Sequence, residues 1–466
     1  MCGIIGIIDN QEDVSYKLYY SLIFLQHRGQ DACGIVTSEN NKLYVKKKNG
    51  LALDSFSEDD LKLLVGKIGV AHNRYSTTGS INDNTQPLII NSNKNKIVLA
   101  HNGNLINYSD LHSSLEKDGC FLTTDVDSEV IIYLIRRQYE FTKDIFESIK
   151  FVMSKIKGAY SVVGFIEDKG LFAFRDPNGI RPLVIGKKEK SYAITSESVV
   201  LQTIDYDFLR DVEPGEIIFI NKDTLELKST KFEISKNAYC MFEWVYFSRP
   251  ESLIQGRSVY KARLALGTAL AKRLKDEEID VIIPVPDTAR TCAIKLAQDL
   301  NVNYGEGLIK NRYVGRTFIM PTNKSRISTL NVKLNPVIGA IKDKVVCVVD
   351  DSIVRGSTSR RIIELIRKGG AKKVIFASSC PPIKYPCYYG IDMSTEEELI
   401  ASNKTIEEIR VFIGADKLIY ATIDDIKDAI KKDLCCACLN NKYPIEVSDQ
   451  SKLFFINDKK NRWVYG

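Results

Sequence analysis

The sequence predicts a two-domain α/β protein whose second domain contains a parallel sheet. At 466 residues the chain is longer than one ordinary hydrophobic core supports, so two domains are expected. Residues 345–349 form a short, largely β-branched apolar run, typical of a strand buried on both faces of a parallel sheet. Predicted strands and helices alternate through the second half, which is the pattern of such a sheet.

The composition is that of a water-soluble globular protein, with 44% apolar and 27% charged residues. The net charge of +6 is a mild excess that does not favour nucleic-acid binding. No apolar run approaches the roughly 20 residues needed to cross a bilayer. The first residues, MCGIIGIID, lack the basic leader of a signal peptide. We therefore expect a cytoplasmic protein with no membrane or nucleic-acid partner.

Cys2 is the first candidate catalytic residue, because it directly follows Met1. Gly3 then opens an alternating apolar strand that is expected to run to Ile8. A small second residue permits removal of Met1, which would place a thiol and a free α-amine on one residue. That amine has a reference pKa of about 7.7–8.0 and can act as general base for the thiol. The alternative is that Cys2 is only part of a buried strand.

Polar motifs recur throughout the first half, several of them next to predicted strands or helices. They are HRGQDACGI at 27–35, HNRYSTTG at 72–79, HNGNLIN at 101–107, TTDVDSEVI at 123–131, RDPNGIRPL at 175–183 and SES at 196–198. Together with Cys2 they resemble the glutamine amidotransferase domain of the N-terminal-nucleophile (Ntn) class, over roughly residues 2–230. The resemblance implies an αββα glutaminase domain with Cys2 as the nucleophile.

The resemblance also assigns the residues that bind glutamine. Arg74 matches the position that binds the α-carboxylate, and Asp127 the position that binds the α-ammonium group. Attack by the thiolate creates an oxyanion that needs preorganised donors. The family supplies these from the positions of Asn102, through its side chain, and Gly103, through its backbone N–H. The histidines at 72 and 101 follow predicted strands directly, and we interpret them as structural residues in preference to catalytic bases.

A change of pattern marks the predicted boundary between domains 2–234 and 235–466. Two predicted strands end at about residue 234, and an aromatic-rich segment, 240–252, follows. Residues 258–275 carry apolar side chains at helical spacing, and a short buried strand is expected at 280–283. Beyond Thr288, residues 310–319 form a basic segment that contains glycine.

The segment 345–359, VVCVVDDSIVRGSTS, combines a buried strand, two carboxylates, a small-residue loop and the start of a helix expected from residue 360. Backbone N–H groups at a helix start favour an anion such as phosphate. Asp350 and Asp351 suit ribose hydroxyls or a Mg²⁺ ion that also holds a pyrophosphate. The segment lacks the Gly-Lys-Ser/Thr ending of a Walker A loop. The alternative is an ordinary strand-to-helix loop with a capping aspartate.

This segment resembles the 5-phosphoribosyl-1-pyrophosphate (PRPP) motif of type I phosphoribosyltransferases. The resemblance implies an α/β phosphoribosyltransferase domain with a parallel sheet. Its implied PRPP-binding residues are Asp350, Asp351, Ser352, Arg355, Gly356, Ser357 and Thr358. One Mg²⁺ per subunit is implied at Asp350, Asp351 and Thr288, and the segment 310–319 matches a loop that closes over PRPP.

A glutaminase domain joined to a phosphoribosyltransferase domain resembles the glutamine PRPP amidotransferase family. The resemblance implies a pentosyl glycosyltransferase that hydrolyses glutamine and transfers ammonia to C1 of PRPP. Pyrophosphate leaves and 5-phosphoribosylamine forms, at the first committed step of de novo purine biosynthesis. It further implies purine nucleotides as feedback inhibitors and a homo-oligomer, either a tetramer or a dimer. The alternatives are a salvage phosphoribosyltransferase with a degenerate first domain and a noncatalytic PRPP sensor.

The eleven cysteines lack the regular spacing of a disulfide framework. Cys435 and Cys438 have a C-x-x-C spacing, and Cys240 and Cys387 are candidates for two further ligands of a metal centre. The iron–sulfur branch of the amidotransferase family has cysteines matching these four positions, which implies one [4Fe–4S] cluster per subunit. Zinc is the alternative occupant, and Cys436 could replace Cys435 as a ligand.

Overall fold

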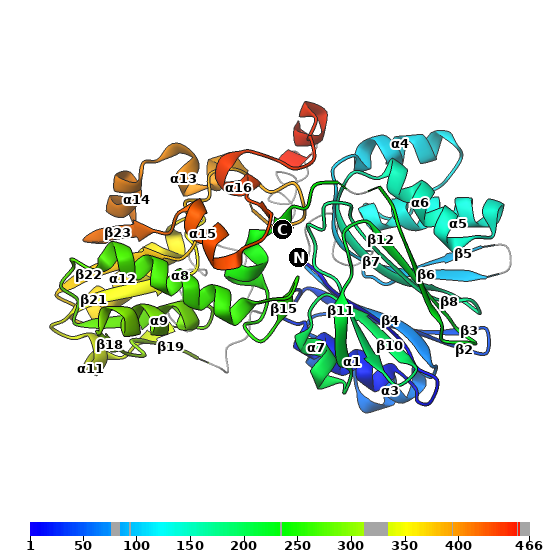
Figure 1. The fold of residues 1–466 in the computed structure, drawn as a ribbon, viewed down its shortest axis with the longest axis horizontal. Helices are drawn as coiled ribbons and strands as arrows, with labels where there is room; N and C mark the ends of the chain where they lie inside the picture. The colour runs from blue at the N-terminus through cyan, green and yellow to red at the C-terminus, as the bar shows by residue number, and fades with distance from the viewer. Residues whose placement is uncertain are drawn as a thin grey trace.

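The computed structural model describes residues 1–75, 84–92, 95–233, 235–311, 334–393, 395–453 and 455–456. The two halves of the chain lie side by side, and the N-terminus lies at their junction (Figure 1). The residue of the predicted domain boundary, 234, lies outside the described residues. So do most of the predicted PRPP loop at 310–319 and the last four residues of the motif at 72–79.

The first half is built on two antiparallel sheets. The first sheet has the order β11-β9-β10-β1-β4-β2-β3 and the second the order β13-β12-β8-β7-β6-β5. The strands of the first sheet are β1 (Gly3–Ile8), β2 (Ala32–Glu39), β3 (Lys42–Asn49), β4 (Ile68–Arg74), β9 (Val184–Lys188), β10 (Ser191–Thr195) and β11 (Asp207–Asp211). Those of the second are β5 (Leu88–Asn91), β6 (Lys96–Leu105), β7 (Gly158–Ile166), β8 (Gly170–Arg175), β12 (Glu216–Asn221) and β13 (Leu227–Lys231).

Helices cover the outer face of each sheet. Apolar side chains of both sheets, such as Ile4, Val70 and Val163, form a core between them. The first sheet is covered by α1 (Ser15–Phe24), α2 (Ala52–Ser55), α3 (Glu58–Leu63) and α7 (Val199–Thr203). The second is covered by α4 (Tyr108–Lys117), α5 (Asp127–Thr142) and α6 (Ile145–Lys155). The layers therefore stack as αββα, as predicted.

The second half contains a five-stranded parallel sheet with the order β18-β17-β21-β22-β23. Its strands are β17 (Val281–Pro284), β18 (Asn303–Tyr304), β21 (Val345–Asp350), β22 (Lys373–Ser378) and β23 (Lys417–Tyr420). One face packs on α8 (Val259–Leu274), α9 (Arg290–Leu300) and α15 (Ile423–Ile430). The other packs on α11 (Ile338–Ile341), α12 (Ser357–Lys368), α13 (Ile400–Asn403) and α14 (Ile406–Ile413). The predicted parallel sheet is confirmed.

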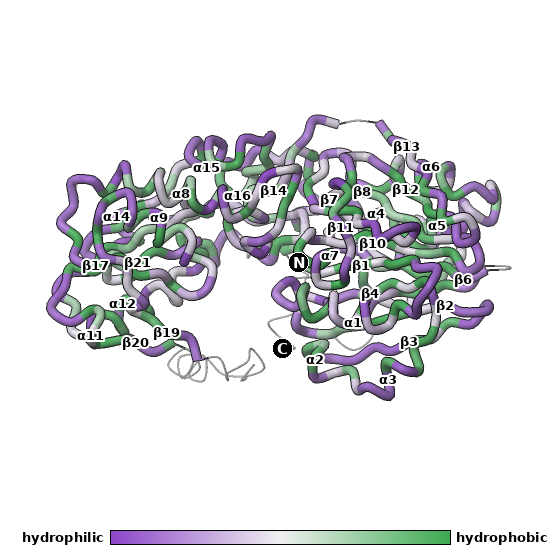
Figure 2. Tube along the Cα trace, turned by 60° about the horizontal axis from the view of Figure 1, so that its bottom comes forward, coloured by the Kyte–Doolittle hydropathy of each residue, from purple (hydrophilic) through white to green (hydrophobic). Residues whose placement is uncertain are grey.

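Short elements complete the second half. They are β14 (Tyr239–Cys240) paired with β24 (Leu434–Cys435), the π-helix η1 (Glu243–Phe247), β15 (Leu253–Ile254) paired with β16 (Arg257–Ser258), β19 (Leu308–Lys310) paired with β20 (Leu334–Pro336), the 3-10 helix η2 (Glu396–Glu398) and α16 (Ala437–Asn440). Hydrophilic residues colour much of the outer loops of both halves in Figure 2, as expected for segments exposed to water.

Three local expectations are corrected by the structure. The strand after Met1 is buried on both faces and not on alternate residues, because it lies at the centre of a sheet covered on both sides. The polar residues His101, Asn102 and Gly103 lie within β6 and not beyond it, because pairing with β7 carries the strand through them. Helix α12 begins at Ser357, three residues earlier than expected. Ser and Thr are tolerated in a first turn, whose N–H groups have no intrahelical acceptor.

Candidate active sites

Cys2 lies where three strands meet at the junction of the two halves. It directly precedes β1, which is paired on one side with β4, so that Gly3 lies opposite Asn73. The backbone N–H of Cys2 donates to Oδ1 of Asn102 on β6 at 3.1 Å. The Cys2 Sγ lies 3.8 Å from the carbonyl oxygen of Tyr75. The two sheets therefore bring residues about 70 and 100 positions apart around one thiol.

Met1 is buried at the same junction, packed among apolar residues from both halves. Its sulfur contacts the guanidinium of Arg181. Burial lowers the pKa of the Met1 α-amino group to about 5. Burial also raises the pKa of the Cys2 thiol, and the nearby α-amino group and Arg74 only partly offset this effect. While Met1 is present, the Cys2 nitrogen is an amide, and an α-amine on Cys2 requires its removal.

Asn102 and Gly103 lie beside Cys2 with the geometry of an oxyanion site. Among the described residues, the buried Nδ2 of Asn102 has no hydrogen-bond partner, although its Oδ1 accepts from Cys2. An unpaired buried donor is costly, so such a group is commonly a ligand-binding group. Gly103 has a φ of 155°, and a Cβ there would overlap the carbonyl oxygen of Ala159. Only glycine fits this position.

Asp127 is the first residue of α5 and is held in place by neighbours on β6. Its Oδ2 accepts from the backbone N–H of Leu105 at 2.9 Å, and its Oδ1 lies 3.3 Å from Nδ1 of His101. Burial alone would raise the pKa of Asp127, but His101 and the Leu105 N–H lower it below the usual value. His101 thus contacts the carboxylate and the Ser128 hydroxyl, in keeping with the structural interpretation of this residue.

The second candidate site lies at the carboxyl end of β21, the position where ligands bind in open α/β sheets. The Ser352 hydroxyl donates to Oδ1 of Asp351 at 2.7 Å, and the Thr288 side chain also hydrogen-bonds to this carboxylate. Burial and the neighbouring Asp351 charge raise the pKa of Asp350 well above its usual value. Burial raises that of Asp351 as well. Two adjacent carboxylates, one buried and one partly buried, suit a divalent cation, which would stabilise both in their charged forms.

The remaining predicted PRPP residues surround the start of α12. Gly356 directly precedes the helix, and Ser357 and Thr358 form its first turn. The N–H groups of such a turn are free of intrahelical acceptors and suit a phosphate. The Arg355 guanidinium donates to Oε2 of Glu398 at 2.9 Å at the surface. The structure therefore brings the loop, the two aspartates and Thr288 to one end of the sheet.

The four predicted cluster cysteines line one small enclosed cavity of about 20 Å³. They are Cys240, Cys387, Cys435 and Cys438. The parallel pairing of β14 with β24 places Cys240 opposite Cys435. Burial raises the pKa of Cys240 to about 12 and those of Cys435 and Cys438 well above the usual value. Thiols gathered at one point suit a cationic centre that would bind them as thiolates.

Cys436 does not line this cavity. Its side chain is buried elsewhere, with Lys427 among the charged groups near it. The structure thus favours Cys435 over Cys436 as the first residue of the C-x-x-C pair. Within the described part of the chain, no group of three or more His, Cys, Asp or Glu side chains is arranged to hold a single metal ion.

Comparisons with known proteins match both halves. One family model, described as a glutamine amidotransferase domain, matches residues 72–203, and another, a phosphoribosyl transferase domain, matches residues 258–401. The amidophosphoribosyltransferase of Methanocaldococcus jannaschii is 46% identical over 96% of this chain and 98% of its own length. That of Escherichia coli is 42% identical over 99% of this chain and 96% of its own. The chain belongs to the amidophosphoribosyltransferase family.

Solved structures agree with this membership of the amidophosphoribosyltransferase family. The glutamine PRPP amidotransferase of B. subtilis, complexed with ADP and GMP, has a TM-score of 0.89 and 42% identity. The match covers 96% of this chain and 98% of that one. A structure described as the allosteric regulatory enzyme of purine biosynthesis has a TM-score of 0.91 and 40% identity, covering 98% and 99%. The predicted family, fold class, enzyme class and reaction, the glutamine-dependent amination of PRPP in purine biosynthesis, are confirmed, whereas the domain boundary and the individual site roles stay predictions.

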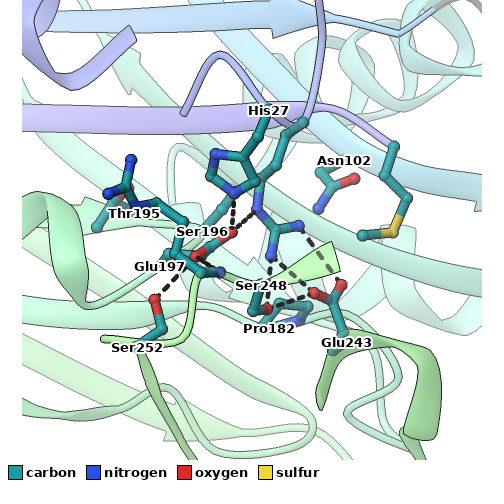
Figure 3. Close-up of polar contacts among 12 residues, drawn as sticks. His27, Asn102, Pro182, Thr195, Ser196, Glu197, Glu243, Ser248 and Ser252 are labelled. Atoms are coloured by element: carbon teal, nitrogen blue, oxygen red, sulfur yellow. Dashed lines mark hydrogen bonds and ion pairs between the residues drawn. The ribbon is translucent and has the colours of Figure 1, made fainter. Parts of the chain in front are cut away.

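One set of polar residues at the junction of the two halves, most of them buried, was not predicted from sequence. Glu197 accepts from Nε2 of His27 at 2.6 Å and from the Ser252 hydroxyl at 2.8 Å (Figure 3). It also accepts from Nε of Arg28. Arg28 also donates to Oε2 of Glu243 at 2.7 Å. Burial would raise the pKa of Glu197, but Arg28 and His27 hold it well below its usual range.

This network joins the two halves, because the residues at 27, 28 and 197 come from the first and those at 243 and 252 from the second. The sequence motifs HRGQ and SES contain three of these residues. Nothing in the sequence, however, pairs Arg28 with Glu197 or Glu243, which lie about 170 and 215 positions away from it. A buried ion pair adds little to the free energy of unfolding, but separating its partners leaves uncompensated buried charges and is costly. Such a network therefore favours one arrangement of the two halves over others.

Proposed function

We propose that Cys2 attacks the side-chain amide of glutamine and that the ammonia released is transferred to C1 of PRPP. Pyrophosphate leaves and 5-phosphoribosylamine forms, as the first committed step of purine biosynthesis. The observation that carries the proposal is Nδ2 of Asn102, which has no partner among the described residues and lies beside Cys2, at the junction with the half that contains Asp350 and Asp351. Family membership supports it.

In the first site, the α-amine of Cys2 takes the thiol proton once Met1 has been removed. The thiolate adds to the amide carbon, and the oxyanion accepts from Nδ2 of Asn102 and the N–H of Gly103. Ammonia leaves and a glutamyl thioester remains, which water hydrolyses to glutamate. Asp127 binds the α-ammonium group of glutamine, and Arg74 binds its α-carboxylate.

In the second site, the N–H groups at the start of α12 and the hydroxyls of Ser352, Ser357 and Thr358 bind the 5-phosphate of PRPP. Asp350 and Asp351 bind the ribose hydroxyls and, with Thr288, would hold one Mg²⁺. When bound, this ion supplies charge neutralisation for the leaving pyrophosphate. Because ammonia becomes ammonium in water, transfer is favoured by a passage between the two sites that excludes solvent.

The proposed reaction is tested by measuring pyrophosphate release from PRPP with glutamine as nitrogen source. We expect release that requires both substrates and produces one glutamate per pyrophosphate. A salvage phosphoribosyltransferase would need a purine base in place of glutamine. A noncatalytic PRPP sensor would bind PRPP and release nothing. Either outcome would contradict the proposal.

Asp127→Asn is expected to weaken glutamine binding. The substitution keeps the size of the side chain and removes the charge that binds the α-ammonium group. A hydrogen bond between charged groups contributes about 1.5–3 kcal/mol, so kcat/KM for glutamine should fall about 10- to 100-fold, mainly through KM. Steady-state kinetics with glutamine measure this. Ammonia-supported transfer should be unchanged, and an unchanged KM for glutamine would remove Asp127 from the binding site.

We also propose that the four cysteines hold one [4Fe–4S] cluster per subunit, with zinc as the alternative. Support comes from their convergence on one enclosed cavity between the start and the end of the second half. A group bound there would tie Cys240 to Cys435 across nearly 200 residues of chain. Such a cross-link restricts the unfolded chain, so the proposed role is structural.

Protein purified without oxygen is expected to be brown, to absorb in the visible range and to contain about four irons per chain. Iron and zinc analysis of the same sample distinguishes the two occupants. Cys240→Ser and Cys387→Ser should each lose iron, whereas Cys436→Ser should keep it. Colourless protein with one zinc per chain, or full iron content in the first two variants, would contradict the cluster.

The remaining proposals concern feedback inhibition and oligomeric state. We propose feedback inhibition by purine nucleotides, which the ADP and GMP bound to the B. subtilis enzyme support for that relative. We further propose a homotetramer or homodimer that acts in the cytoplasm. Among the described residues, no helix is both long and apolar enough to span a membrane.

A further inference from the structure

Residues 387–392 of the second half reach across the junction and lie against the strand that carries Gly103. A Cβ built on Gly390 would lie 2.7 Å from the carbonyl oxygen of Gly103 and 2.8 Å from its carbonyl carbon. Gly390 has a φ of 91°, which L-residues with side chains rarely adopt. The two glycines are therefore in direct backbone contact, with no room for a side chain between them.

The same segment makes two further contacts with the first half. The Asn104 side chain donates from Nδ2 to the carbonyl oxygen of Tyr388 at 2.8 Å. The Arg181 guanidinium donates to the carbonyl oxygen of Tyr389 from Nε at 3.0 Å and from Nη2 at 2.5 Å. Both donors are side chains of the first half, and both acceptors are backbone carbonyls of the segment. These bonds hold the segment in register with β6.

On its other side the segment is anchored within the second half. The Tyr389 hydroxyl donates to the carbonyl oxygen of Ile445 at 2.6 Å and accepts from its N–H at 3.0 Å. The Tyr443 hydroxyl donates to the carbonyl oxygen of Pro386 at 2.7 Å. The segment is thus a fixed support and not a loose loop resting on the first half.

Gly103 is confined from two sides. Gly390 lies against its carbonyl group, and the backbone of Ala159 on β7 lies where a Cβ would otherwise point. The N–H and C=O of Gly103 share one Cα, so a displacement of the carbonyl also displaces the N–H. A donor to an oxyanion must lie within about 2.7–3.1 Å of it, which leaves little tolerance for such movement.

We propose that Gly390 is a positioning residue for the glutaminase reaction, acting from the phosphoribosyltransferase half of the chain. It supports Gly103 so that the Gly103 N–H faces the oxyanion formed at Cys2. The inference rests on the proposed role of Gly103. It means that the oxyanion site is complete only while the two halves are docked, because one of its supports belongs to the other half.

Gly390→Ala is the direct test. The new methyl group meets backbone, which cannot rotate away, so either Gly103 or the segment must shift. Loss of one oxyanion donor costs about 10²–10³-fold in kcat; we expect displacement to lower the glutaminase kcat about 10-fold or more, with little change in KM for glutamine. Transfer supported by added ammonia should stay at the level of the unmodified enzyme, which also shows that the variant is folded.

Gly414→Ala is the matched control. Gly414 follows α14 with a φ of 79°, so the substitution brings similar backbone strain. A Cβ there has no heavy atom of the described chain within 4 Å. Glutaminase kcat should be unchanged in this variant. A Gly390→Ala enzyme with normal glutaminase kcat, or an equal loss in both variants, would overturn the proposal.

A second pair keeps the test decisive if Gly390→Ala fails to fold. Asn104→Ala removes the bond to Tyr388 without adding a clash. It should lower glutaminase kcat by a larger factor than the factor by which KM for glutamine changes. Asn107→Ala removes two bonds within the first half, one from Nδ2 to the carbonyl oxygen of Lys155 at 2.9 Å and one from the Lys157 N–H to Oδ1 at 2.8 Å. It should leave kcat unchanged. Equal kcat values in these two variants would overturn the proposal.

The experiment separates this inference from the proposed function. If Gly103 does not stabilise the oxyanion, Cys2→Ala still abolishes glutamine hydrolysis, but neither Gly390→Ala nor Asn104→Ala changes kcat. If Cys2 is not the nucleophile, Cys2→Ala retains glutamine hydrolysis, and the proposed function fails first.

Discussion

Cys2→Ala is expected to abolish glutamine-supported synthesis of phosphoribosylamine and to leave ammonia-supported synthesis intact. In the proposed mechanism the side chain of Cys2 performs only the thioester chemistry, and the contacts of Cys2 are with Asn102 and Tyr75 of the first half. Loss of a nucleophile removes about 10⁴-fold or more of the rate, since the remaining groups cannot form the covalent intermediate. Pyrophosphate release with glutamine and with ammonium chloride measures the two activities separately.

A chain that keeps Met1 should lose the same activity. Its Cys2 nitrogen is an amide and cannot accept the thiol proton, and the Met1 side chain stays packed at the junction. Mass spectrometry of the N-terminus, compared with glutaminase activity across preparations, tests this. The Cys2→Ala chain, with ammonia as substrate, is the control for folding. Substantial use of glutamine by Cys2→Ala would remove the N-terminal nucleophile from the mechanism.

Asp350→Asn and Asp351→Asn are expected to have the opposite effect. Transfer from glutamine and from ammonia should fall together by about 10²–10³-fold, because a cation at the leaving pyrophosphate contributes several kcal/mol to transition-state stabilisation. Glutamine hydrolysis without transfer should persist, since the Cys2 site keeps all its residues. Glutamate and pyrophosphate are measured in the same reaction. A ratio of glutamate to pyrophosphate well above one shows that glutamine hydrolysis is uncoupled from transfer.

Asn at either position keeps the size of the side chain, so changes in packing are small. Thermal unfolding should therefore show that the two variants are folded, and removal of one of two repelling buried carboxylates is not expected to destabilise the sheet. Titration of Mg²⁺ should show a weaker dependence of the residual transfer rate on the ion. Normal transfer by Asp351→Asn would show that this loop does not bind the sugar.

The largest features of the fold could be predicted from sequence because they depend on local pattern. The run at 345–349 indicated a buried strand, and the structure has β21 there, at the centre of a parallel sheet. The helical spacing at 258–275 gave α8 within one residue at each end. The resemblance of the motifs to those of a known family indicated the family, which the comparisons confirm. Element ends were less predictable, as at α12 and β6, because pairing and first-turn chemistry decide them.

The candidate site residues were also named from sequence, but their neighbours were not. Cys2 was singled out by its place after Met1, and Asn102 and Asp127 were assigned by the resemblance of their motifs to the glutaminase family. The Arg28–Glu197–Glu243 network could not be predicted, because hydrogen bonds between distant positions leave no local pattern. The same holds for the contact of Gly390 with Gly103, which joins two glycines that no spacing rule relates.

The sequence by itself determined which chemistry this protein carries: a thiol next to the N-terminus, an acidic pair after a buried strand, and four cysteines in three separate segments. Residue type and local spacing suffice for that, because reactivity belongs to individual side chains and strand or helix formation to short segments. Only the tertiary structure decided which of these groups meet. It seated Cys2 beside Asn102, gathered Cys240, Cys387, Cys435 and Cys438 around one cavity, and placed Gly390 against Gly103. The first two contacts form within one half of the chain, where segments far apart in sequence pack against each other, and the third forms where the two halves dock. Such contacts depend on surfaces that are complete only after each core has formed, so no local pattern in the sequence predicts them.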